Sequence, residues 1–174
     1  MARAFRGIRR APPAGGSGLT EEASRSGTIL QDGRRKAYRP IPPDRRRAAL
    51  EAGLAAYERG NFFEAHELLE PAWMGTSDLA ERSLYQGLIK LAAGYVHAIR
   101  GNPIGMTRNL RGARKYLEVS LQTGPQHSVN AGIDLQSLLV EIDARLVAVT
   151  TLPSLVNSVR GVMLDLADQA PPIR

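Results

Sequence analysis

Cysteine is absent from the 174-residue chain, and only nine residues are aromatic. The lack of cysteine excludes disulfides, thiolate metal sites and cysteine nucleophiles. Because small secreted domains commonly depend on disulfides, we expect a cytoplasmic protein. With so few aromatic side chains, the sequence offers no platform on which nucleotide bases would stack.

Long hydrophobic runs are also missing. The most apolar stretch, residues 84–99, is interrupted by three polar residues and is too short to cross a bilayer. The N-terminal segment contains arginines but lacks an apolar core of the length that a signal peptide needs. We therefore expect no membrane partner.

Acidic residues are scarce at the start of the chain, and the net charge of +6 is unevenly distributed. Residues 1–47 contain twelve Lys/Arg and four Asp/Glu, a net charge of +8, whereas residues 48–174 contain eleven and thirteen, a net charge of −2. Binding to nucleic acid depends on neutralising phosphates with cations. We therefore expect any nucleic-acid contact to occur only through the N-terminal arm.

Residues 1–43 have no sustained apolar period and are rich in proline and glycine. Such a segment cannot bury enough surface to offset its chain entropy, so we expect a disordered basic arm over 1–43 and a helical domain over 44–170. The arm either contacts nucleic acid or an acidic partner, or it is a solvated tail or the product of a start codon placed too early.

Helical periodicity and capping residues predict an all-α fold, a compact bundle of about five to six helices arranged as antiparallel hairpins. The triplet Arg59-Gly60-Asn61 recurs as Arg100-Gly101-Asn102, which indicates two hairpins of similar build. The pattern sets no oligomeric state and is compatible with a homo-oligomer. The expected helices are 44–60, 61–74, 77–100, 102–122, 135–146 and 155–166.

Charged and chargeable residues lie on the apolar face of the second expected helix. On a helical wheel, His66 and Glu70 fall inside the apolar arc between Phe63 and Trp73, and Glu67 lies at its edge. Buried ionisable groups are costly unless they are paired, so something must satisfy this pair.

One interpretation is a metal site. Residues four apart on a helix share a face, so His66 and Glu70 can bind one divalent ion together. His97 of the third helix is the candidate third ligand, Glu67 the candidate general base, and Gln86 a candidate contact to the ligands. Zinc and manganese are the expected ions.

Two other interpretations stay open. His66 and Glu70 can form a purely structural hydrogen-bonded cluster, or a metal-free ligand or catalytic site. The fourth helix carries Arg108 on a basic stripe, which is either a solvated face or a contact for an anion or phosphate. Further candidates for binding residues are Trp73, Gln86, Asn102 and Arg108.

The sequence resembles the bacterial and archaeal family called "domain of unknown function 309". The likeness covers roughly residues 45–147 and is carried by the stretch 59–73, by Gln86-Gly87-Leu88-Ile89, by His97 and by Gly101-Asn102. The resemblance implies an all-helical fold and a His-x-x-x-Glu-x-x-Trp signature, matched here by His66, Glu70 and Trp73. The signature has been suggested to bind metal, so the resemblance implies a metal site here. No reaction is assigned to the family.

Taken together, the sequence predicts a metal-binding helical protein with hydrolase-like chemistry. The alternative is a non-enzymatic interaction module, in which the paired hairpins present a groove and the basic arm contacts an acidic partner or RNA.

Overall fold

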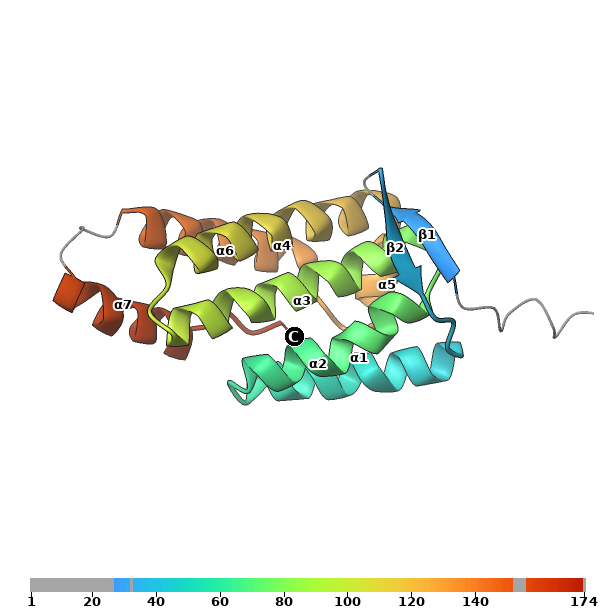
Figure 1. The fold of residues 1–174 in the computed structure, drawn as a ribbon, viewed down its shortest axis with the longest axis horizontal. Helices are drawn as coiled ribbons and strands as arrows, with labels where there is room; N and C mark the ends of the chain where they lie inside the picture. The colour runs from blue at the N-terminus through green and yellow to red at the C-terminus, as the bar shows by residue number, and fades with distance from the viewer. Residues whose placement is uncertain (1–26, 32, 152–155, 174) are drawn as a thin grey trace, which may run out of the picture.

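The computed structural model describes residues 27–31, 33–151 and 156–173. Within them, a β-hairpin precedes seven α-helices that pack against one another (Figure 1). The expectation for residues 1–26 lies outside the described residues. None of the described helices has the length and apolar character that crossing a membrane requires. The elements are β1 (Gly27–Gln31), β2 (Arg34–Tyr38), α1 (Pro43–Glu58), α2 (Phe62–Gly75), α3 (Leu79–Ile99), α4 (Pro103–Thr123), α5 (Pro125–Asn130), α6 (Leu135–Thr150) and α7 (Val156–Asp168).

The predicted all-α bundle of antiparallel hairpins is confirmed, and its first two hairpins turn in the same way. Gly60 after α1 has φ +77°, and Gly101 after α3 has φ +64°. In both turns the N–H of the next asparagine donates to a carbonyl five residues earlier, at 2.9 Å. This is a Schellman ending, which favours glycine because only glycine adopts positive φ without strain. The repeated Arg-Gly-Asn triplet is therefore a repeated helix end.

Helix α3 is the centre of the bundle. In Figure 1 it runs between α1 and α2 on one side and α4 on the other. Its side chains Leu84, Leu88 and Leu91 are almost fully buried. At Gly87 an added Cβ would lie 2.5 Å from Leu117 of α4, so glycine lets these two helices approach closely. Helix α3, which positions α2 and α4, is thus a well-packed central helix.

The start of α3 and the segment after α4 differ from the expectation. Helix α3, which we expected to begin at residue 77, is capped by Asp78, because the Asp78 carboxylate accepts the N–H groups of Ala80 and Glu81 at 2.8 and 3.0 Å. A short helix, α5, follows Gly124, where the sequence predicted only a loop. The bundle therefore has one helix more than expected.

The described part of the expected disordered arm contains an ordered hairpin. Strands β1 and β2 pair antiparallel, from Gly27 opposite Tyr38 to Gln31 opposite Arg34. After β2 the backbone continues along the last turn of α2, where the Arg39 N–H donates to the Met74 carbonyl at 2.9 Å. Residues 27–31 and 34–38, for which we expected disorder, are therefore strands of a hairpin that lies on the helical bundle.

A buried arginine holds this hairpin on the bundle. The Arg82 side chain of α3 is 0% exposed. Its guanidinium donates to Gln31 of β1 at 3.0 Å and to the carbonyl of Ala37 of β2 at 2.8 Å. It also donates to the carbonyls of Trp73 and Thr76 at 2.6 and 3.2 Å. All four acceptors are neutral, so one cation joins the hairpin, the end of α2 and α3.

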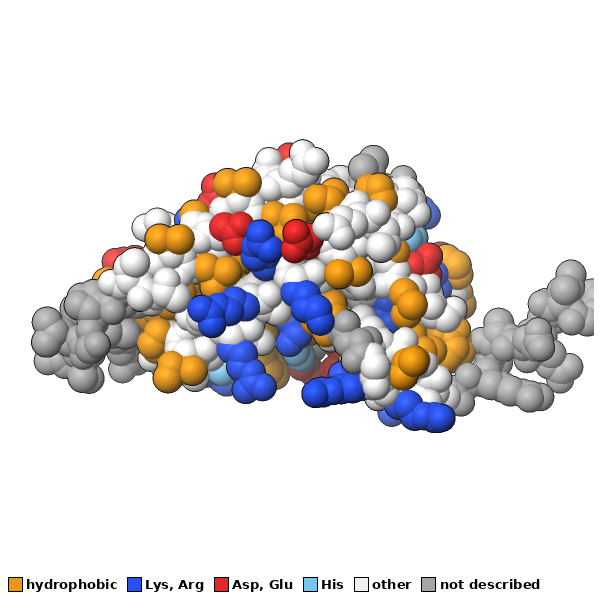
Figure 2. All heavy atoms as spheres, turned by 90° about the horizontal axis from the view of Figure 1, so that it is seen from above, with side chains coloured by type: hydrophobic (Ala, Val, Ile, Leu, Met, Phe, Trp, Pro, Cys, Tyr) orange, Lys and Arg blue, Asp and Glu red, His pale blue; other side chains and the backbone are white. Residues whose placement is uncertain are grey.

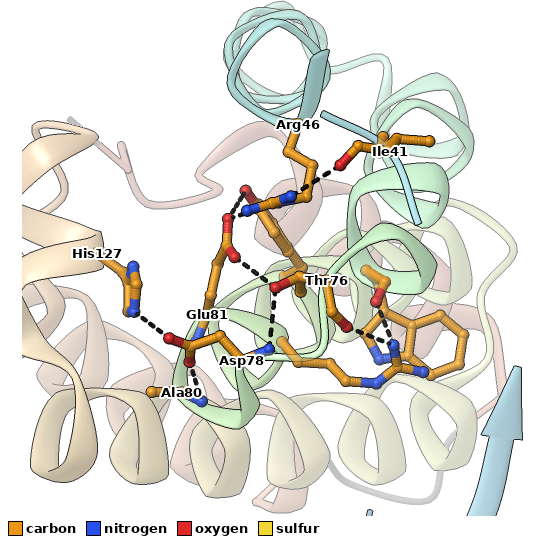
Figure 3. Close-up of polar contacts among 10 residues, drawn as sticks. Ile41, Arg46, Thr76, Asp78, Ala80, Glu81 and His127 are labelled. Carbon is orange, nitrogen blue, oxygen red and sulfur yellow. Dashed lines mark hydrogen bonds and ion pairs between the residues drawn. The ribbon is translucent and has the colours of Figure 1, made fainter. Parts of the chain in front are cut away.

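A second polar network joins α1 to α3 through Glu81, as Figure 3 shows. The Glu81 carboxylate accepts from Arg46 at 3.0 Å, from Thr76 at 2.5 Å and from Tyr85 at 2.9 Å. Burial alone would raise the pKa of Glu81, but these three donors outweigh it and lower that pKa below its ordinary value.

Candidate metal site on helix α2

Helix α2 packs on the bundle through one stripe of small and large apolar side chains. The spacing of these residues is that of a helix face, at i, i+3, i+7 and i+10. All four are at most 4% exposed: Phe62, Ala65, Leu69 and Ala72. The residues beside this stripe lie at the rim of the helix–helix contact.

Three ligand-type side chains converge on that rim. The Nδ1 atom of His66 lies 3.0 Å from Oε1 of Glu67. One ligand atom from each of His66, Glu67 and Glu70 lies within 4.8 Å of the others. The side chains of His66 and Glu67 are 31% and 53% exposed. The group is thus a half-open cluster whose members all come from a single helix.

The cluster is less buried than the sequence predicted. We expected His66 and Glu70 inside an apolar arc next to Phe63, but Phe63 is 62% exposed. The reason is the rotation of α2, which turns the side of Phe62 and Leu69 toward α1 and α3. Water therefore reaches the cluster. Its charged side chains do not need a partner to offset a cost of burial.

His97 is not a member of this group, although the sequence predicted it as the third ligand. It lies in the last turn of α3, and its Nδ1 is 3.2 Å from Nδ2 of Asn102. A Cβ on Gly105 of α4 would be 2.5 Å from the same nitrogen. The ring therefore packs on the start of α4, and the third member of the group on α2 is Glu67.

The other predicted site residues lie outside the group of three. Trp73 stacks its ring under the guanidinium of Arg82, with the Cζ atom 4.6 Å from the ring centroid. Gln86 is buried at 8% exposure within α3. Asn102 caps α4 by accepting the N–H of residue 105 at 2.8 Å. Arg108 lines a groove on α4. These four residues support the fold or other surfaces rather than the candidate ligands.

Sequence reasoning missed Arg82 and Glu81, the residues at the centre of the buried polar networks. A signal for Arg82 was present, because it lies one turn before Tyr85 and Gln86 on the face of α3 that becomes buried. Its acceptors were not predictable, since two of them belong to a hairpin that the sequence did not reveal.

The three converging side chains have the donor types that hold zinc, manganese and iron: one imidazole and two carboxylates. With a proton on Nδ1, His66 donates to Glu67 and leaves Nε2 for an ion. A carboxylate that orients a ligand histidine in this way is a common feature of metal sites. Two or three protein ligands leave coordination positions open, as in catalytic rather than structural sites.

Residues 50–109 match the model of a family described as "Domain of unknown function (DUF309)". The match runs from α1 into the first part of α4 and includes the cluster on α2. No curated protein and no solved structure matches the chain.

Proposed function

We propose that this chain, whose residues 50–109 belong to the domain of unknown function 309 family, binds a divalent cation at the rim of α2. His66 and Glu70 would be the ligands, and Glu67 would orient the imidazole or add a carboxylate oxygen. The observation that carries the proposal is the convergence of three ligand atoms within 4.8 Å.

Two physical arguments support the proposal. Two carboxylates next to one another repel, and a cation between them relieves this repulsion. The cluster is also rigidly mounted, because the stripe beside it is fully packed against α1 and α3. A fixed ligand group on a helix needs little reorganisation when an ion arrives.

The proposal extends to hydrolase-like chemistry. A divalent ion with open positions lowers the pKa of a bound water and so supplies a nucleophile at neutral pH. In the general-base role that the sequence predicted, Glu67 would take the proton that the bound water gives up as it attacks the substrate.

The test is the metal content of protein purified without a histidine tag and then incubated with zinc or manganese. We expect about one ion per chain for the wild type, because a real site must fill. Glu70→Gln and His66→Ala should lose it. Glu64→Gln is the matched control. Glu64 is exposed on the same helix but lies outside the cluster, and its carboxylate accepts a hydrogen bond from the Asn61 side chain at 3.2 Å.

Less than about 0.2 ion per chain in the wild type would overturn the proposal. Equal metal content in Glu70→Gln and Glu64→Gln would contradict the assignment of the ligands. If the wild type binds no metal while His66→Ala changes only stability, the cluster is structural and the interaction module becomes the better function.

A further inference from the structure

A lysine from α3 lies against a glycine of α4. Lys90 is half-buried, and a Cβ added at Gly112 would be 2.6 Å from its Cδ and 3.4 Å from its Nζ. The bare glycine backbone therefore makes room for the aliphatic part of Lys90. The ammonium group of Lys90 therefore lies against the surface of α4 and does not point freely into solvent.

Other cations surround that ammonium. Arg108 lies four residues before Gly112 and Lys115 three residues after it, so both are on the same face of α4. Lys36 belongs to β2, which Arg82 fixes against α3. Burial lowers the pKa of Lys90, and the three neighbouring cations lower it further. Three separate elements thus bring positive charges to one place.

Lys36, Lys90 and Arg108 differ from a neighbouring arginine in how their charges are balanced. Within the described ranges, no carboxylate pairs with Lys36, Lys90 or Arg108. By contrast Arg114, which directly precedes Lys115 on α4, is held by Asp143 at 2.7 Å and by Glu118 at 3.1 Å. Figure 2 shows basic side chains gathered on this face with a smaller group of acidic ones beside them.

We propose that Lys36, Lys90, Arg108 and Lys115 form a binding site for a phosphate group. Crowded like charges destabilise the empty surface, so an anion that enters gains attraction from all of them. A guanidinium offers a two-pronged contact to phosphate, and ammonium groups add point charges around it. A phosphate, with more than one negative charge, matches several cations better than a single carboxylate does.

The phosphate group has two possible carriers, a small phosphorylated compound or the backbone of a single-stranded nucleic acid. The site is separate from the metal cluster on α2 and does not depend on it. The site joins Arg108, where the sequence left an anion contact open, to Lys90 of α3 and to Lys36 of β2, so it would allow nucleic-acid contact outside the N-terminal arm as well.

The experiment measures binding of the full chain to two probes, inorganic pyrophosphate and a short single-stranded RNA, in buffer containing EDTA. We expect Arg108→Gln and Lys90→Gln each to weaken binding about tenfold, the loss typical of a hydrogen bond to a charged group. Arg114→Gln removes the same charge from the same helix, and because Arg114 is already paired, it should change binding less than about twofold.

A charge-neutral variant separates this site from general attraction of anions. Gly112→Ala places a Cβ where the Lys90 stem lies, so it should weaken binding without altering the net charge. Circular dichroism confirms that each variant is folded. Pyrophosphate that competes with RNA identifies one shared site, while binding of only one probe identifies the carrier. If neither probe binds, or if Arg108→Gln and Arg114→Gln lose affinity equally, the proposal is overturned.

Discussion

Arg82 and the cluster of His66, Glu67 and Glu70 are both charged groups next to α2, and they differ in how they are satisfied. Arg82 is 0% exposed and donates to four neutral acceptors from three parts of the chain. The cluster is half-open, comes from one helix, and makes one internal contact, between His66 and Glu67. The comparison teaches that the buried charge is used to hold the fold, whereas the charges at the rim remain available for a ligand.

Replacing the buried cation should have the largest effect on stability. Arg82→Met leaves four acceptors without their donor and frees the hairpin from α3, so we expect a loss of about 3 kcal/mol or more in the free energy of unfolding. Chemical denaturation measures it. Arg114→Met, at a half-exposed arginine of α4, should lower the free energy of unfolding by much less, because exposed ion pairs contribute little to stability. Equal losses in the two variants would show that the buried arginine contributes no more to stability than the half-exposed one.

Metal should stabilise the protein by a somewhat smaller amount. An ion that binds only the folded state adds about 2.7 kcal/mol at one hundred times its dissociation constant. We expect zinc or manganese to raise the unfolding temperature of the wild type and of Glu64→Gln, but not of His66→Ala. Without metal, His66→Ala should differ from the wild type by less than about 1 kcal/mol, because the site is half-open. A large loss in metal-free buffer would instead indicate a structural cluster.

Acid should weaken the network at Glu81 more modestly. Because the folded protein lowers the pKa of Glu81, its contribution to stability is present above the ordinary glutamate pKa of 4.5 and is lost as the pH falls through the lowered value. Wild-type stability should therefore fall more steeply with acid than that of Glu81→Gln, by about 1 kcal/mol. Parallel curves for the two proteins would show that Glu81 titrates as it does in the unfolded chain.

The smallest effect should come from the exposed neighbour of the cluster. Phe63 is 62% exposed, so Phe63→Ser should change stability by no more than about 0.5 kcal/mol. Phe62, the next residue back, is 4% exposed, and Phe62→Ala should cost about 3 kcal/mol or more. Equilibrium unfolding of this pair tests whether α2 is rotated as the structure has it.

The sequence predicted those parts of the fold that local rules determine. Gly60 and Gly101 marked two helix ends, and the spacing of four residues placed His66 beside Glu70. It did not predict the hairpin, because Arg34-Arg35-Lys36 has no apolar alternation and the order of this segment depends on Arg82, whose side chain contacts a glutamine 51 residues earlier in the sequence. It could not decide about His97, since the position of this ring depends on how closely α3 and α4 pack, as they do at Gly105, where an added Cβ would lie 2.5 Å from Nδ1 of His97.

The most direct test of the proposed metal site observes the imidazole rings themselves. The chain has three histidines, His66, His97 and His127, so their ring signals can be followed separately by NMR while zinc is added to tag-free protein. The account predicts that the ring nitrogens of His66 shift at one equivalent of zinc while those of His97 and His127 stay in place. Shifts at His97 before or together with His66, or no shift at His66, would contradict it.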